Sequence, residues 1–316
     1  MGTYIIRRLL SAIPTLIVIS MVIFSILKLA PGDPLSDFAL NPAIPPAVRE
    51  NIRQQLGIND PIPVQYSKWA TSWIKGDWGY SFKSKIPVRD WVGQRLPTTI
   101  FVLGLAFLLG IAIALPLGIL AAVKQYSAFD NIATTFAFFG FSVPTFLSGL
   151  ICMLIFAINL GWFPLVYSAP GNGNSFSYSL KSAAMPIMVL GFFQGARLMR
   201  FTRAAMLENI RLDYVRTARA KGLREGAVVM AHVVRNALIP VVTIMALEVP
   251  GIFGGAIVTE RIFRVNGIGD LLITSIQGSD IPVVMAIVFI ISILVVLSNL
   301  VADVAYGILD PRIKYS

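Results

Sequence analysis

Six long apolar runs dominate the sequence, and they limit the chain to a fold that a lipid bilayer can hold. A helix needs about 20 predominantly apolar residues to cross the hydrocarbon core, and each run is close to that length or longer. The sequence therefore predicts an all-α membrane protein with about six transmembrane helices. The runs are Leu9–Ala30, Pro97–Val123, Asn131–Leu160, Ala183–Met199, Asn236–Val258 and Val283–Leu309.

Three of the runs contain residues that interrupt an ideal membrane helix. The third is broken by Pro144, the fourth is short and contains Gln194, and the fifth carries Pro240 and Pro250. Neighbouring helices can satisfy the backbone groups that proline leaves free. All three runs therefore remain predicted spans, although hydropathy alone does not define where they end.

The overall composition agrees with a membrane protein. Apolar residues make up 56% and charged residues 13% of the 316 residues, whereas soluble domains carry roughly 25% charge. The net charge of +10 does not indicate a nucleic-acid partner, because the Lys and Arg residues lie mostly between the apolar runs. Cys152 is the only cysteine and lies within an apolar run, so we expect neither a disulfide framework nor a metal cluster.

Basic residues between the runs predict the orientation in the membrane. Arg7 and Arg8 precede the first run, Lys124 follows the second, and nine Lys and Arg residues fall between positions 197 and 235. Cytoplasmic loops are enriched in such residues, and with six spans all of these lie on one side, so both termini are predicted to be cytoplasmic. The first run is too long for a signal-peptide core of roughly 7–15 residues, and we expect it to be retained as a span.

The segment between the first two runs, Pro31–Leu96, is then external and too rich in aromatic residues for a flexible linker. Pro31–Pro34 and Gly76–Gly79 are typical of turns. We expect a small external domain here, with residues 1–96 as one unit, and favour a folded cap over a ligand-binding role. Four tryptophans provide a candidate core: Trp69, Trp73, Trp78 and Trp91.

The loop that follows the fourth run has the pattern of a docking segment. If the loop is helical, small and apolar residues fall on one face at steps of three or four and charged residues fall on the other. A stripe of small residues permits a close approach of another protein, and Arg side chains can bind its carboxylates. An ordinary positive-inside loop is the alternative. The apolar face contains Val215, Ala218, Gly222, Gly226 and Val229, and the charged face contains Asp213, Arg216, Lys221 and Arg224.

The residues of this loop resemble the coupling loop of the dipeptide and oligopeptide permeases of ABC importers. The similar stretches are Tyr214–Gly222, His232–Ala237 and Ile239–Pro240. Of the broader Glu-Ala-Ala motif of importers only Ala218 and Gly222 match, a departure expected of the peptide subfamily. Further similar stretches extend over nearly the whole chain: Ile5–Leu10, Pro31–Pro34, Gln55–Gly57, Gly76–Ser81, Arg95–Thr99, Ser142–Pro144, Gly267–Gly269 and Asp310–Ile313.

The resemblance implies a type I ABC importer transmembrane domain over residues 97–316, with a coupling loop at about 203–235, in a bacterial cytoplasmic (inner) membrane. It implies as partners a second homologous permease subunit, two cytoplasmic ATPase subunits and an external solute-binding protein. Peptides are the implied cargo, with nickel, glutathione or another small solute as alternatives. The implied ATPase-coupling residues are Asp213, Tyr214, Val215, Arg216, Thr217, Ala218, Arg219, Lys221 and Gly222.

The sequence gives no sign of catalysis by this chain. A Gly-x4-Gly-Lys-Ser/Thr phosphate-binding loop is absent from the sequence, so ATP and magnesium are expected in the partner subunits. His232 is the only histidine, which excludes paired-histidine metal sites and argues against a Ser/His or Cys/His catalytic unit. We expect no cofactor in this chain.

Polar residues within the runs are candidates for the translocation path. Ionisable groups in membranes are costly and usually face the bundle interior or a cavity. Glu248, Gln194 and Asp303 could line the path or could join neighbouring helices, and Glu248 has the stronger claim because it lies nearer the middle of its run. A secondary transporter would usually show inverted repeats, which we do not find. A membrane enzyme would need Asp270 and Asp303 as its acidic pair.

Overall fold

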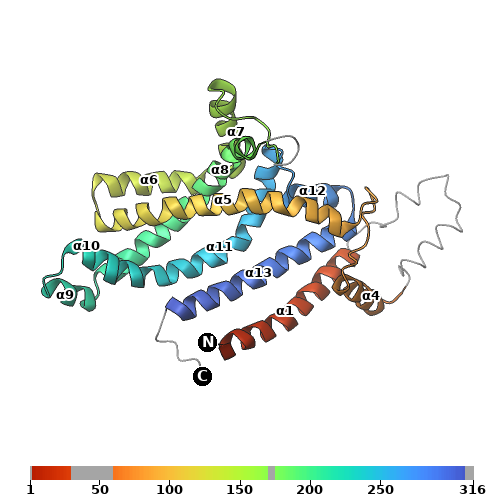
Figure 1. Ribbon diagram of the computed structural model, residues 1–316, viewed down its shortest axis with the longest axis horizontal. Helices are drawn as coiled ribbons and strands as arrows, with labels where there is room; N and C mark the ends of the chain where they lie inside the picture. The colour runs from red at the N-terminus through yellow and green to blue at the C-terminus, as the bar shows by residue number, and fades with distance from the viewer. Residues whose placement is uncertain (1, 30–59, 170–174, 310–316) are drawn as a thin grey trace, which may run out of the picture.

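The computed structural model describes residues 2–29, 60–169 and 175–309. Nearly all of this part of the chain is helical, apart from short connections (Figure 1). The helices are α1 (Gly2–Leu29), α4 (Ile62–Ile74), α5 (Val88–Val123), α6 (Ala128–Ser142), α7 (Thr145–Cys152), α8 (Phe176–Ile210), α9 (Asp213–Ala220), α10 (Glu225–Ala227), α11 (Arg235–Ile262), α12 (Ile268–Gln277) and α13 (Ile281–Leu309). Two π-helical segments extend them, η1 (Met153–Asn159) and η2 (Val228–Val234).

Five of the described helical segments are long and apolar enough to cross a membrane, and a bent pair of helices brings the number to six. Each predicted run coincides with one of these elements. The fourth run was predicted as Ala183–Met199, but α8 extends well beyond it at both ends. The Ser175 side chain accepts a hydrogen bond from the Tyr178 N–H at the start of α8. The polar residues past Met199 are mostly good helix formers, so the helix continues where hydropathy falls.

The third run is not one straight helix. The axes of α6 and of the segment from α7 through η1 differ by 103°, which confirms the break predicted at Pro144. Proline has no N–H to donate and forces the preceding residue out of the helical region, and Val143 is accordingly extended, with ψ of 126°. As a result α7 and η1 turn away from the direction of α6 and lie at the top of Figure 1, where α7 contacts α8 and α11.

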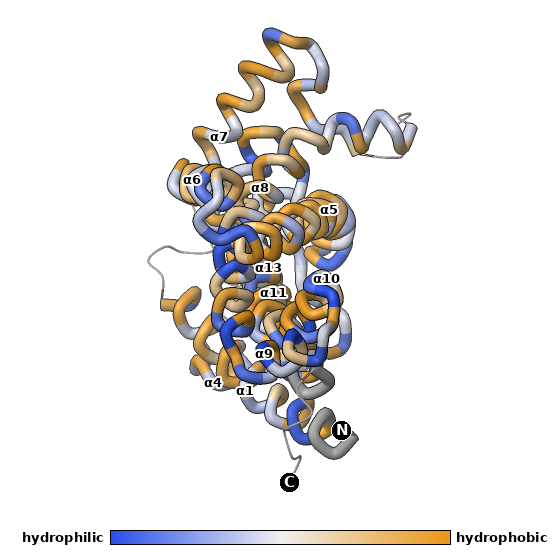
Figure 2. The backbone as a smooth tube through the Cα atoms, turned by 90° about the vertical axis from the view of Figure 1, so that its left-hand side faces the viewer, coloured by the Kyte–Doolittle hydropathy of each residue, from blue (hydrophilic) through white to orange (hydrophobic). Residues whose placement is uncertain are grey.

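Small residues bring α5 and α8 together at the centre of the fold. A Cβ atom on Gly191 would lie 2.9 Å from the Ala106 carbonyl oxygen, and one on Gly110 would lie 3.2 Å from the Gly191 carbonyl oxygen. Further along the same contact, a Cβ on Gly118 would lie 2.7 Å from Thr202. The glycines are therefore needed for the close approach of the two backbones. Helices α6 and α11 contact both members of this pair, and α13 and then α1 lie farther out on the α11 side (Figure 2).

The first and last helices pack against each other on one side of the bundle. In Figure 1, α1 and α13 run side by side below α5 and α11, and contacts between them are extensive. Arg8 of α1 forms an ion pair with Asp303 of α13, with 3.3 Å between nitrogen and oxygen. Most of the apolar surface of α1 stays exposed, as expected of a helix that lipid surrounds.

The described part of the external segment lies on the membrane helices and has no separate core. None of the residues of α4 is buried. The Trp69 ring lies 5.7 Å from that of Phe24 on α1, and Trp73 lies 4.7 Å from Phe289 on α13 and stacks on Trp78 at 4.9 Å. The prediction that the tryptophans form their own small core is therefore wrong, because the nearest apolar surface belongs to α1 and α13. Trp91 likewise packs with α12 and α13.

Several sequence stretches singled out above lie outside the described residues. These are Pro31–Pro34, Gln55–Gly57 and Asp310–Ile313. The turn predicted at Gly76–Gly79 is described and confirmed, because both glycines have positive φ, of 86° and 78°. Asp77 also accepts a hydrogen bond from the Gly79 N–H at 3.0 Å, as a turn aspartate commonly does.

Candidate coupling surface and translocation path

The predicted coupling loop folds as a short helix that ends in a glycine turn. Helix α9 is followed by Gly222, whose φ of 77° favours glycine. The Lys221 and Gly222 N–H groups donate to the carbonyls of Thr217 and Arg219, at 3.1 and 2.9 Å. The chain then turns and enters α10. The expectation of one continuous helical face through Gly226 is therefore wrong, since the left-handed turn at Gly222 redirects the chain.

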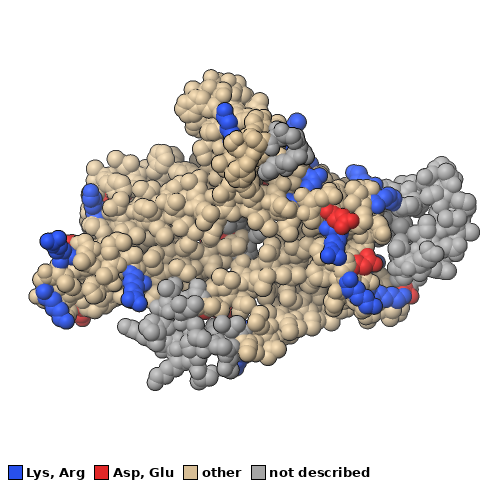
Figure 3. Space-filling view, in the orientation of Figure 1, with Lys and Arg blue, Asp and Glu red and all other residues tan. Residues whose placement is uncertain are grey.

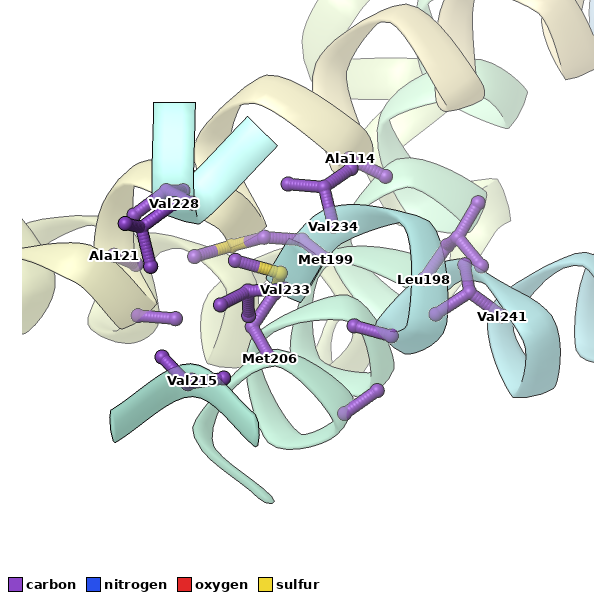
Figure 4. Packing of buried hydrophobic residues seen from close by; sticks show 14 of the residues in the cluster. Ala114, Ala121, Leu198, Met199, Met206, Val215, Val228, Val233, Val234 and Val241 are labelled. Atoms are coloured by element: carbon purple, nitrogen blue, oxygen red, sulfur yellow. The ribbon is translucent and has the colours of Figure 1, made fainter. Parts of the chain in front are cut away.

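The apolar face of α9 is occupied by the protein itself. Val215 is fully buried and Ala218 is 5% exposed. They belong to a cluster with residues of α5, α8 and η2, among them Met206 and Val233 (Figure 4). Val215 and Ala218 therefore attach α9 to the bundle and cannot form the docking stripe that the pattern predicted. Gly222 remains exposed.

The opposite side of α9 is exposed and largely basic. We call it the α9 surface; its exposed members are Asp213, Tyr214, Arg216, Thr217, Arg219, Lys221 and Gly222. Two ion pairs shape it: Arg216 lies 3.3 Å from Asp213, and Arg219 donates to both carboxylate oxygens of Glu225, at 3.0 and 2.6 Å. The hydrogen bond to Glu225 raises the pKa of Arg219 above its ordinary value. In Figure 3, charged side chains gather at this end and at the opposite end, and most side chains between them on the face shown are uncharged.

Two of the three predicted path residues lie together. Glu248 of α11 forms an ion pair with Arg197 of α8, with 3.0 Å between oxygen and nitrogen. Gln194, one turn earlier on α8, lines the same small pocket as Glu248, and its side-chain oxygen is buried without a hydrogen-bond partner among the described residues. Asp303 is not part of this group, because it pairs with Arg8 between α1 and α13. Glu248 and Gln194 thus form one polar site between α8 and α11.

A buried ion pair that the sequence did not reveal lies at the same end as the α9 surface. Asp130, 2% exposed, accepts hydrogen bonds from Arg203 Nε at 2.6 Å and from a terminal nitrogen at 2.7 Å. It also accepts from the Tyr126 N–H and the Thr134 hydroxyl. The Ser127 side chain caps the Asp130 N–H at 3.2 Å, so a serine followed three residues later by an acid was the available signal.

A second buried carboxylate was missed at the opposite end. Glu260, 2% exposed, accepts a hydrogen bond from the Thr99 hydroxyl at 3.0 Å and one from the Asp270 N–H at 2.9 Å. Thr99 in turn accepts from the Ile268 N–H at 2.8 Å. The carboxylate lies directly against Gly267, where a Cβ would collide with it. This packing gives a physical reason for the Gly267–Gly269 stretch.

The acidic pair that a membrane enzyme would need is not assembled. Asp270 lies at the start of α12, beside Glu260. Asp303 lies near the far end of α13, about 30 Å along that helix from its start at the α12 side. Asp270 and Asp303 are therefore held at opposite ends of the bundle, and the paired-carboxylate alternative is not supported.

Comparison with solved structures identifies the fold. A structure described as "Crystal structure of an amino acid ABC transporter with histidines" matches with a TM-score of 0.52 and 13% identity, over 69% of this chain and 93% of that chain. At this identity the similarity concerns the fold alone. The chain has the fold of a type I ABC importer transmembrane domain.

Comparison of sequences identifies the family. Residues 114–315 match the family described as binding-protein-dependent transport system inner membrane component, and residues 1–103 match its N-terminal counterpart. Over 100% of both chains, this chain is 42% identical to the oligopeptide transport system permease protein AppB of Bacillus subtilis (strain 168). It is 38% identical to the glutathione transport system permease protein GsiC of Pectobacterium atrosepticum, again over 100% of both chains. The chain belongs to this family of binding-protein-dependent transport permeases.

Proposed function

We propose that the chain is one permease subunit of an ATP-driven importer and forms half of a translocation path for peptides. Family membership establishes a transport role that depends on a binding protein. The relatives that match over the full chain are named for oligopeptide, peptide and glutathione transport. All three cargoes are peptides or peptide-like, which supports a peptide cargo over nickel or another small solute.

The observation that carries this proposal is the construction of the α9 surface. An exposed basic helix is attached to the ends of several long helices by the buried Val215 and Ala218. Arg216 and Lys221 offer charged hydrogen bonds to carboxylates on another protein. A force applied to the exposed side of α9 therefore reaches α8 and η2 through direct packing. We assign this surface to the ATPase partner.

In the proposed complex, this chain pairs with a second homologous permease, two ATPase subunits bind the α9 surfaces, and an external binding protein delivers the solute at the other end. ATP and magnesium bind in the ATPase subunits, and no bond is hydrolysed by this chain. The α9 end and both termini are cytoplasmic, in keeping with the basic residues of the loops. Closure of the ATPases moves the α9 surfaces and exchanges inward-facing for outward-facing arrangements.

The test changes Gly222 within the complete transporter reconstituted in vesicles with its binding protein. A β-branched residue strongly disfavours positive φ, so Gly222→Val should distort the turn after α9. Placing a non-glycine residue in the left-handed conformation costs roughly 1–2 kcal/mol. We therefore expect peptide uptake per ATP hydrolysed to fall about tenfold, with membrane insertion unchanged.

Gly226→Val is the matched control. Gly226 is exposed, has no positive φ, and a Cβ there would meet no atom within 4 Å. Normal coupled uptake by Gly222→Val, or equal losses in the two variants, would contradict the assignment of the α9 surface to an ATPase.

A further inference from the structure

A cavity of about 530 Å³ lies between α6 and α8, next to the Arg197–Glu248 pair. Its wall contains three arginines of α8 at every third position and two phenylalanines of α6. The residues of interest are Arg197, Arg200, Arg203, Phe138 and Phe141. A cavity with this lining combines positive charge with aromatic surface.

Two of the three arginines are neutralised within the chain. Arg203 is bound to Asp130 by two hydrogen bonds, and Arg197 is paired with Glu248. Arg200 has no carboxylate partner among the described residues. Its guanidinium lies over the rings of Phe138 and Phe141, 4.6 and 4.7 Å from their centroids. The rings hold this cation in place, so the cavity keeps one positive charge that the protein does not compensate.

The position of the Arg197–Glu248 pair argues that this face of α8 does not face lipid. Arg200 directly follows the fourth apolar run, which ends at Met199, and Arg197 lies one turn inside that run. Its partner Glu248 lies near the middle of α11. Charged side chains at such depth almost always face a bundle interior or a water-filled cavity. The exposed face that carries Arg197 and Arg200 therefore has the properties expected of a wall of the translocation path.

We propose that Arg200 binds the carboxylate of the transported solute inside the path, and that this cavity is a transient subsite for solutes with a free carboxylate. The proposal rests on the proposed function of the chain as a peptide permease. A guanidinium keeps its charge at any physiological pH and can bind a carboxylate through two parallel hydrogen bonds. An uncompensated Arg200 also repels a bare metal cation, which excludes nickel as the ion in this subsite.

The experiment measures uptake by the reconstituted transporter of one peptide in two forms, with a free and with an amidated C-terminus. Rates for each variant are divided by the rate of the unchanged transporter for the same form, which removes any preference of the binding protein. We expect Arg200→Gln to reduce uptake of the free-carboxylate form about tenfold, the value of one charge-assisted hydrogen bond, and the amidated form much less. Arg200→Lys keeps the charge but not the paired hydrogen bonds, so its uptake of the free-carboxylate form should lie between that of Arg200→Gln and that of the unchanged transporter. Arg89→Gln, an exposed arginine of α5 at the other end of the bundle, is the matched control.

The outcomes separate the two proposals. Equal losses for both forms, or equal rates for Arg200→Gln and Arg200→Lys, would overturn the carboxylate subsite and assign Arg200 a packing role. Undiminished uptake of the free-carboxylate form by Arg200→Gln would also overturn it. Failure of the unchanged transporter to take up either form with ATP would instead refute peptide transport itself.

Discussion

Both ends of the bundle contain buried carboxylates, and those of Asp130 and Glu260 are stabilised differently. At the α9 end, Asp130 is bound by the guanidinium of Arg203. At the α12 end, Glu260 is bound by neutral donors, the Thr99 hydroxyl and the Asp270 N–H. No Lys or Arg within the described residues forms an ion pair with Glu260. The first end thus depends on opposite charge, and the second on close packing around glycines.

Loss of the contact between Asp130 and Arg203 should have the largest effect on the stability of the protein. Asp130→Ala leaves the Arg203 guanidinium and the Tyr126 N–H without their acceptor, which should lower the free energy of unfolding by about 3 kcal/mol. Thermal unfolding of the purified chain in detergent measures the change. Asp213→Ala removes an exposed ion pair and should have a much smaller effect. Equal effects of the two substitutions would show that burial of the Asp130 pair does not matter.

Disturbing the close packing around Gly267 at the other end should give the second largest loss of stability. A Cβ on Gly267 collides with the Glu260 carboxylate, so Gly267→Ala should lower the free energy of unfolding by about 2 kcal/mol, as for overpacking of a core. Gly93→Ala is the control, because a Cβ there meets no atom within 4 Å and alanine favours helix. The comparison between the two ends fails if Gly267→Ala is as stable as Gly93→Ala in the same unfolding measurement.

The smallest effect should come from Glu260→Gln, which keeps the shape of the side chain. If its oxygen faces the Asp270 N–H, its NH2 group can donate to the Thr99 oxygen beside the Ile268 N–H, but the Thr99 hydroxyl then loses its acceptor. In the other orientation the NH2 group faces the Asp270 N–H. One donor is left without an acceptor in either orientation of the amide, a change of about 1 kcal/mol. Glu208→Gln, at an exposed position, should leave the unfolding temperature unchanged. A loss as large as that of Asp130→Ala would indicate that a full negative charge at Glu260 is required.

Sequence alone was sufficient for the membrane helices because each apolar run is a local property. It missed Glu260 because hydropathy ended the fifth run at Val258, whereas the helix continues to Ile262. The partner of Glu260, Thr99, belongs to a different run, and no local pattern connects the two. A buried carboxylate that is bound by distant groups cannot be recognised from its neighbours in the chain.

Only the part of the candidate site that depends on local periodicity could be predicted from the sequence. The charged face of α9 follows from helical periodicity, and the structure places these residues at the surface. The same periodicity could not reveal that Val215 and Ala218 face their own chain, because burial depends on α8 and η2. Arg200 was missed because its distinguishing property, the absence of a carboxylate partner among the residues that the structure describes, appears only when its neighbours are in place.

The packing of α1 against α13 has a consequence for the synthesis of the protein. Of the described helices, α1 is synthesised earliest and finds its main helical neighbour in α13, which is synthesised latest. Until α13 is inserted, α1 lacks this main packing contact in the bilayer, including the ion pair between Arg8 and Asp303. A chain cut short before α13 would therefore keep its first helix inserted but unpacked, and would be a natural substrate for membrane quality-control proteases.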